Sequence, residues 1–121
     1  MTNDLSKPIT EQQFTNSLLQ WAKALGWRCF HVRTSGRMNY SGQPIPTVQG
    51  DKGFPDLVLA KPPRLIFAEL KVGKGKVRTE QQQWLAALGG YARECYVWRP
   101  DDWSRIIVVL SSRKVQNDVA S

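Results

Sequence analysis

Two carboxylates and a lysine lie near the middle of this chain, in two apolar runs. Asp56 comes directly before the run 57–60, while Glu69 and Lys71 close the longer run 65–71. Side chains alternate between the two faces of a strand, so Glu69 and Lys71 are expected to share one face. Carboxylates suit a hard divalent cation, and a nearby lysine suits developing negative charge. These three residues are therefore the first candidates for a site.

The prolines between the two runs donate no backbone hydrogen bond, which predicts a turn and hence a hairpin. If 61–64 is a four-residue loop, Ala60 pairs with Leu65 and the two carboxylates face each other. Such opposed like charges are destabilising because their Cβ atoms lie only about 4.5–5.5 Å apart. A Mg²⁺ or Mn²⁺ ion would neutralise them, with the backbone carbonyl of Leu70 as an expected further ligand. The alternative is an amphipathic hairpin whose lysine forms only a salt bridge.

A helix with an acidic first turn is predicted upstream of this hairpin. Residues 10–13 match a capping box, and apolar residues follow at helical spacing before Gly26: Phe14, Leu18, Trp21, Ala22 and Leu25. Glu11 falls on nearly the same stripe as Leu18, so we expect it to face inward and join the acids. The alternative is a glutamate that only complements the helix dipole.

A second helix is predicted downstream, with a capping box at 79–82. Gln81, Trp84, Leu85 and Leu88 share one face of it. Gln81 is thus expected to face the site, where its amide can orient a water, a phosphate or the lysine; the alternative is a glutamine satisfied by backbone. A strand over 95–99 and a last helix from Asp101 through Leu110 complete the predicted elements.

The charge balance favours a polyanionic partner. The chain has 17 Lys and Arg against 10 Asp and Glu, a formal net charge of +7 and a pI near 9.8. A long segment, 35–54, has no usable period and is rich in glycine, and a glycine-loosened basic run follows Lys71. The candidate nucleic-acid contacts are Arg33, Arg37, Lys52, Lys74, Lys76 and Arg78. The alternative is a solvated basic surface on an ordinary protein.

The 121 residues are expected to form one domain, 1–121, with loose tails over 1–9 and 111–121. The two cysteines, Cys29 and Cys95, imply neither a disulfide framework nor a zinc site. No run approaches the roughly 20 apolar residues that span a bilayer, so we expect no membrane association and a cytoplasmic location.

Pro55-Asp56, twelve intervening residues and Glu69-Leu70-Lys71 together resemble the PD-(D/E)xK nuclease signature. The surrounding arrangement resembles the VRR-NUC branch of that superfamily. The matching features are Glu11 in the opening helix, Gly53-Phe54-Pro55-Asp56, Glu69-x-Lys71, Glu80-Gln81-x-x-Trp84-Leu85, and Trp98-Arg99-Pro100-x-Asp102-Trp103. They cover nearly the whole chain, from residue 10 to about residue 110.

The resemblance implies an α/β protein with a restriction-endonuclease-like core, in which helices flank a mixed β-sheet. It implies a metal-dependent DNA endonuclease in which Asp56 and Glu69 bind Mg²⁺ or Mn²⁺ and Lys71 assists catalysis. Glu11 would bind or orient the metal through water, and Gln81 would support the site. Short stand-alone members of bacterial or phage origin resemble junction-resolving enzymes, which implies branched DNA such as four-way junctions or flaps as substrate, and a homodimer. The alternatives are a non-catalytic nucleic-acid-binding module of this fold and an RNA-directed nuclease.

Overall fold

The computed structural model describes residues 9–32, 40–42, 50–90 and 94–113. Along the chain the elements are α1 (Glu11–Ala24), β1 (Arg28–His31), β2 (Leu57–Lys61), β3 (Arg64–Leu70), α2 (Thr79–Gly89), β4 (Glu94–Trp98), a short 3₁₀ helix η1 (Pro100–Asp102) and α3 (Trp103–Ser111). The predicted contacts Arg33 and Arg37 lie outside the described residues, as do the predicted tail residues 1–8 and 114–121.

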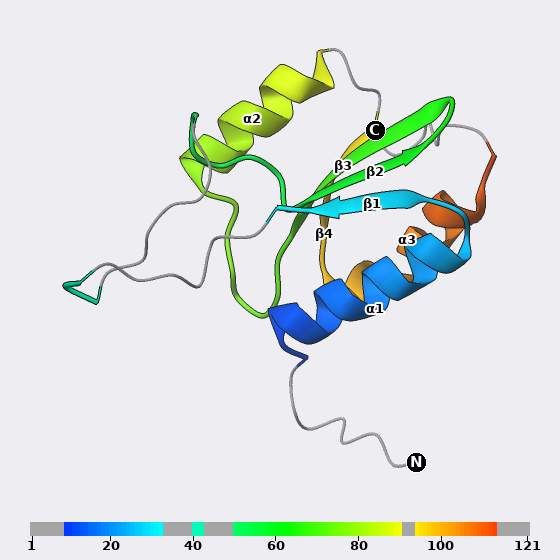
Figure 1. Ribbon diagram of the computed structural model, residues 1–121, viewed down its shortest axis with the longest axis horizontal. Coiled ribbons are helices and arrows are strands. Elements are labelled where there is room, and N and C mark those ends of the chain that lie inside the picture. Colours follow the sequence, from blue (N-terminus) through cyan, green and yellow to red (C-terminus); the bar gives the residue numbers. More distant parts are fainter. Residues whose placement is uncertain (1–8, 33–39, 43–49, 91–93, 114–121) are drawn as a thin grey trace.

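The four strands form one mixed sheet in the order β1-β2-β3-β4 (Figure 1). β1, β2 and β3 are joined antiparallel, whereas β3 and β4 are parallel. A parallel pair needs a long crossover connection, and α2 lies in it. The expected α/β class with a mixed sheet and flanking helices is therefore confirmed.

The predicted hairpin register is confirmed, because Ala60 pairs with Leu65. The predicted four-residue loop is wrong: Lys61 and Arg64 also pair, which leaves Pro62 and Pro63 alone in the turn. The two prolines suffice for the turn because neither has an N–H to contribute to the ladder.

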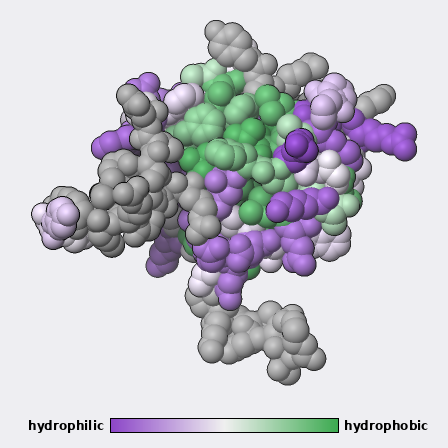
Figure 2. Space-filling view, viewed as in Figure 1, coloured by the Kyte–Doolittle hydropathy of each residue, from purple (hydrophilic) through white to green (hydrophobic). Residues whose placement is uncertain are grey.

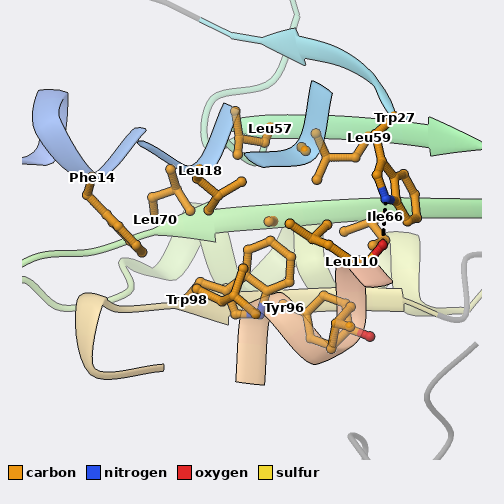
Figure 3. Packing of buried hydrophobic residues seen from close by; sticks show 14 residues of the cluster. Phe14, Leu18, Trp27, Leu57, Leu59, Ile66, Leu70, Tyr96, Trp98 and Leu110 are labelled. Atoms are coloured by element: carbon orange, nitrogen blue, oxygen red, sulfur yellow. Dashed lines mark hydrogen bonds between the residues drawn. The ribbon is translucent and has the colours of Figure 1, made fainter. Parts of the chain in front are cut away.

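The hydrophobic core lies between one face of the sheet and the helices α1 and α3 (Figures 1 and 3). Alternate strand residues point into it, and Phe14, Leu18 and Ala22 of α1 meet them. The strand members are Leu57, Leu59, Ile66, Ala68, Leu70, Tyr96 and Trp98. Trp27 closes one end of the core by donating its indole N–H to the carbonyl of Leu110 at 3.0 Å (Figure 3).

The opposite face of the sheet carries α2, which covers only part of it (Figure 1). Phe30, Val58 and Phe67 lie side by side across β1, β2 and β3 on this face, and Phe30 is 63% exposed. Hydrophobic residues gather in the upper middle of Figure 2, where the strands lie in the same view of Figure 1, and hydrophilic residues lie below them and to the right. The carboxylate pair and the lysine of the hairpin lie on this less covered face.

The first capping box is confirmed, since Gln13 N donates to Thr10 Oγ1 at 3.0 Å and Thr10 N donates to Gln13 Oε1 at 2.9 Å. The inward orientation expected for Glu11 is wrong, because its side chain is exposed; Trp21, one of the apolar residues at helical spacing, is 47% exposed. Helical spacing gives the angle of a side chain around the axis. It does not say how far neighbouring elements extend along that axis.

The cap of α2 lies one residue earlier than predicted, at Arg78, whose backbone N–H donates to Gln81 Oε1 at 2.8 Å. The last helix also differs slightly, because η1 precedes it and α3 continues to Ser111. None of the helices among the described residues has the length and apolar character needed to cross a membrane.

A buried ion pair that the sequence analysis missed joins β3 to β4. Arg64, predicted to lie in a loop, donates from Nε to Glu94 Oε2 at 2.9 Å, and both residues are buried. Its Nη1 donates to the carbonyls of Val109 and Ser112 at the end of α3. Ser112 was expected in a loose tail, but this bond fixes it to the sheet.

Candidate active site

Asp56 is positioned by hydrogen bonds from the backbone at the ends of both neighbouring strands, β1 and β3. Its carbonyl accepts from Val32 N at 2.8 Å, directly after β1. Its side-chain Oδ2 accepts from the backbone N–H of Leu70 at 2.8 Å, at the end of β3. Since Leu57 pairs with Ala68, the register extended by one residue places Asp56 opposite Glu69, as predicted.

Glu69 is buried, with 2% of its surface exposed, although it lies on the sheet face away from the hydrophobic core. Its Oε2 accepts from Gln81 Nε2 at 2.6 Å and lies 3.3 Å from Lys71 Nζ. Its Oε1 is buried and has no hydrogen-bond partner. A buried carboxylate oxygen without a partner is rare, because losing hydration without compensation is costly.

The electrostatics of Glu69 reflect this environment. Burial, followed by the nearby negative charge of Asp56, raises the pKa of Glu69 to about 7, although the Lys71 ammonium opposes the shift. Near neutral pH, the protein alone therefore only partly supports an ionised carboxylate here. A bound cation would favour the ionised form.

Lys71 is held against β4, because its backbone N–H donates to the carbonyl of Trp98 at 3.0 Å. Its ammonium lies on the same side of the sheet as Glu69, as strand alternation predicted. The salt bridge proposed as the alternative exists. It does not account for the second oxygen of Glu69, which remains without a partner.

Gln81 projects from the first turn of α2 to the acids and is buried, as predicted. One end of its amide donates to Glu69, and the other accepts from Arg78 N at 2.8 Å. It thereby fixes the start of α2 to the end of β3. The side chain of Gln81 therefore bonds both to the backbone, as in the alternative interpretation, and to a residue of the site, as predicted.

Gly53, which the sequence analysis used only as part of a motif, allows α2 to approach the segment before Asp56. Its φ is +97°, and a Cβ added to it would lie 2.6 Å from the backbone carbon of Glu80. No other residue fits this contact without movement. A glycine before Phe-Pro-Asp was the only sequence signal of this approach.

Glu11 does not join the two acids. Its helix packs on the core face of the sheet, opposite α2, and the side chain is exposed. Among the residues that the structure describes, no group of three or more His, Cys, Asp or Glu side chains comes close enough to hold a metal. The described side chains thus supply a pair of carboxylates, Asp56 and Glu69, and the role predicted for Glu11 stays a prediction.

The pair nevertheless fits a hard divalent ion. Glu69 offers an oxygen without a protein partner, and the negative charge of Asp56 helps to raise the pKa of Glu69. Carboxylate oxygens are the donors that Mg²⁺ and Mn²⁺ prefer, and Mg²⁺ commonly uses one or two carboxylates together with water and phosphate oxygens. The carbonyl of Leu70 stays a predicted ligand, and its N–H already bonds to Asp56.

Exposed cations lie on the two segments that adjoin the candidate site along the chain. Lys74, Lys76 and Arg78 lie between β3 and α2, and Lys52 precedes the hairpin. Arg99, which the sequence analysis did not consider for this role, donates from Nη2 to the carbonyl of Gly75 at 2.7 Å. It thereby holds the basic segment to the end of β4.

We compared the chain with protein-family models, with characterised proteins and with solved structures, and none of the three comparisons found a match.

Proposed function

We propose that this protein is a divalent-metal-dependent nuclease that hydrolyses phosphodiester bonds in DNA. The observation that supports this most is the buried, unpartnered Oε1 of Glu69 beside Asp56. A core that served stability alone would gain from replacing Glu69 with an uncharged residue. The proposal also takes the fold to be a restriction-endonuclease-like core.

Each residue of the site has a distinct part in this reaction. Asp56 and Glu69 would hold the ion, which when bound neutralises phosphate charge and lowers the pKa of a water molecule. Lys71 would stabilise the negative charge that develops on the phosphate. Gln81 keeps the Glu69 carboxylate in one orientation through its 2.6 Å hydrogen bond.

The substrate follows from the charge around the site. Lys52, Lys74, Lys76 and Arg78 provide exposed cations near the acids, and each phosphate they contact adds affinity that salt weakens. We further propose branched DNA as the substrate and a homodimer as the active form, because symmetric cuts across a junction need two active sites.

Cleavage assays test the proposal directly. Purified protein is incubated with supercoiled plasmid, a four-way junction and a flap, each with Mg²⁺, with Mn²⁺ and with EDTA. We expect cleavage with metal and none with EDTA. Intact DNA under every metal condition would leave a non-catalytic binding module, and cleavage of RNA in preference to DNA would indicate an RNA-directed nuclease.

Matched variants then test the assigned residues. Asp56→Asn and Lys71→Ala should abolish cleavage while DNA affinity stays within about twofold, because the basic segment contributes most of the affinity for DNA. Asp101→Asn removes an exposed carboxylate elsewhere and should cut normally. Loss of binding in parallel with cleavage would contradict this division of roles.

A further inference from the structure

A cavity of about 560 Å³ opens between α2 and the segment that leads to Asp56. Its lining residues are Asp51, Lys52, Glu80, Gln83, Trp84 and Ala87. The four from α2 follow one another at helical spacing and form a stripe along the helix. At about 100° per residue, Gln81 lies a quarter-turn or so from Glu80 around the helix axis, so one helix borders the acids and the cavity on adjoining sides.

The cavity and the acids are in fixed relation because the same two segments border both. Asp51 and Lys52 lead directly to Asp56, and this segment touches α2 where Gly53 meets the backbone of Glu80. A ligand in the cavity would therefore lie next to a phosphate held at Asp56 and Glu69. A position so close to the phosphate suits a nucleotide of the same strand.

Trp84 gives the cavity a rigid aromatic wall. Its indole N–H donates to the carbonyl of Asp51 at 3.1 Å. Its ring contacts Phe54 edge to face, with centroids 4.9 Å apart, and Phe54 contacts Phe67 in the same manner at 6.0 Å. An aromatic ring fixed in this way suits stacking with a base, which typically contributes about 1–3 kcal/mol.

The charges that line the cavity select a base rather than a phosphate. Among the described residues of the lining, two carboxylates, Asp51 and Glu80, accompany one ammonium, that of Lys52, so this part of the lining repels a second anion although the chain is basic as a whole. A carboxylate has two acceptor oxygens and pairs best with two adjacent donors. Among the four DNA bases, guanine alone presents two adjacent donors, N1–H and N2–H, on its Watson–Crick edge.

We propose that this cavity binds an unpaired guanine base next to the phosphate that is cut. Trp84 stacks on the base, and Asp51 or Glu80 accepts from its Watson–Crick edge. In duplex DNA this edge is paired, so the cavity favours substrates with unpaired bases close to the cleavage site, as in flaps, loops and opened junctions. The position relative to the cut rests on the proposed function, whereas the binding of guanine does not.

Titration of the full chain with nucleosides in EDTA tests the inference without any cleavage. The probe is the indole N–H resonance of Trp84, assigned by its disappearance in Trp84→Phe, and the ligands are guanosine, inosine and cytidine. We expect guanosine to shift this resonance saturably. Inosine lacks the N2 amino group and should bind at least about tenfold more weakly, since a hydrogen bond to a charged group contributes about 1.5–3 kcal/mol.

Two variants separate recognition from adventitious contact. Asp51→Asn combined with Glu80→Gln should weaken guanosine binding about tenfold, while Asp101→Asn, an exposed carboxylate outside the cavity, should not change it. Ala87→Trp places a ring from an exposed helix position into the cavity and should abolish binding.

The inference is overturned if guanosine leaves the resonance unchanged, if the three nucleosides bind within twofold of one another, or if both cavity variants bind like the unmodified protein. Metal-dependent cleavage of DNA in any of these cases would leave the proposed nuclease intact. Selective guanosine binding by a protein that cuts no DNA would instead refute the proposed nuclease function and support guanine binding in the cavity.

Discussion

Replacing Gly53 with alanine is expected to weaken the fold and the candidate active site together. Gly53 has a φ of +97°, and an added Cβ would lie 2.6 Å from Glu80 C and 2.8 Å from Gln81 N. These are backbone atoms of the first turn of α2, so no side chain can rotate away to make room. The helix or the segment before Asp56 has to move.

The size of the effect follows from two contributions. Placing an alanine in the left-handed region costs about 1–2 kcal/mol, and overpacking a fixed contact costs about 1–3 kcal/mol more. Gly42 provides a matched control, because its φ is +79° and, apart from its chain neighbours, no described residue has an atom within 4 Å of its added Cβ. Gly53→Ala should therefore lower the free energy of unfolding by about 2–5 kcal/mol, and Gly42→Ala by only the first contribution.

Urea unfolding of both variants and of the unmodified protein measures this difference. Cleavage should also fall in Gly53→Ala, because a displaced α2 lengthens the 2.6 Å hydrogen bond between Gln81 and Glu69, whereas Gly42→Ala should cut normally. Equal destabilisation by the two substitutions would refute the close approach of α2 to Gly53.

Three further predictions concern charged residues. Because the pKa of Glu69 is raised to about 7 from an ordinary 4.5, the folded state holds its proton more tightly than the unfolded state, so metal-free stability should fall as pH rises between these values. Glu69→Gln should remove this decrease and the stabilisation by Mg²⁺ at pH 8, as measured by thermal unfolding. Glu94→Gln should cost about 3–5 kcal/mol in urea unfolding, because it leaves the buried Arg64 without its charged partner; a cost below about 1 kcal/mol would contradict that pairing. The double substitution of Lys74→Ala and Lys76→Ala should weaken the salt dependence of DNA binding. The slope of log binding constant against log salt concentration should fall in magnitude by about 0.9 for each phosphate that these lysines neutralise. An unchanged slope would exclude both lysines from the interface.

Much of the hairpin could be predicted from the sequence because its signals are local. Two prolines without N–H groups set the turn, and the alternation of apolar residues set the faces. The register then placed Asp56 opposite Glu69, with Lys71 on the side of Glu69, as observed. Helical spacing likewise brought Gln81 to the site.

Predictions that needed the relative position of distant elements were less successful. Glu11 has the right angle on α1, yet its helix covers the opposite face of the sheet from Gln81. Arg64 was expected in the hairpin loop, but it lies buried in β3, and Glu94, thirty positions away, makes this burial possible. Neither residue carries a local signal for its partner.

The sequence by itself thus determined which residues share a strand face or a helix stripe, because backbone periodicity alone sets that geometry. The tertiary structure decided which of these faces meet. Where α2 packs against Gly53, Gln81 bonds to Glu69 and a cavity forms that Trp84 lines. These contacts depend on side-chain volumes and crossing distances between segments far apart in the chain, and no short stretch of sequence encodes them.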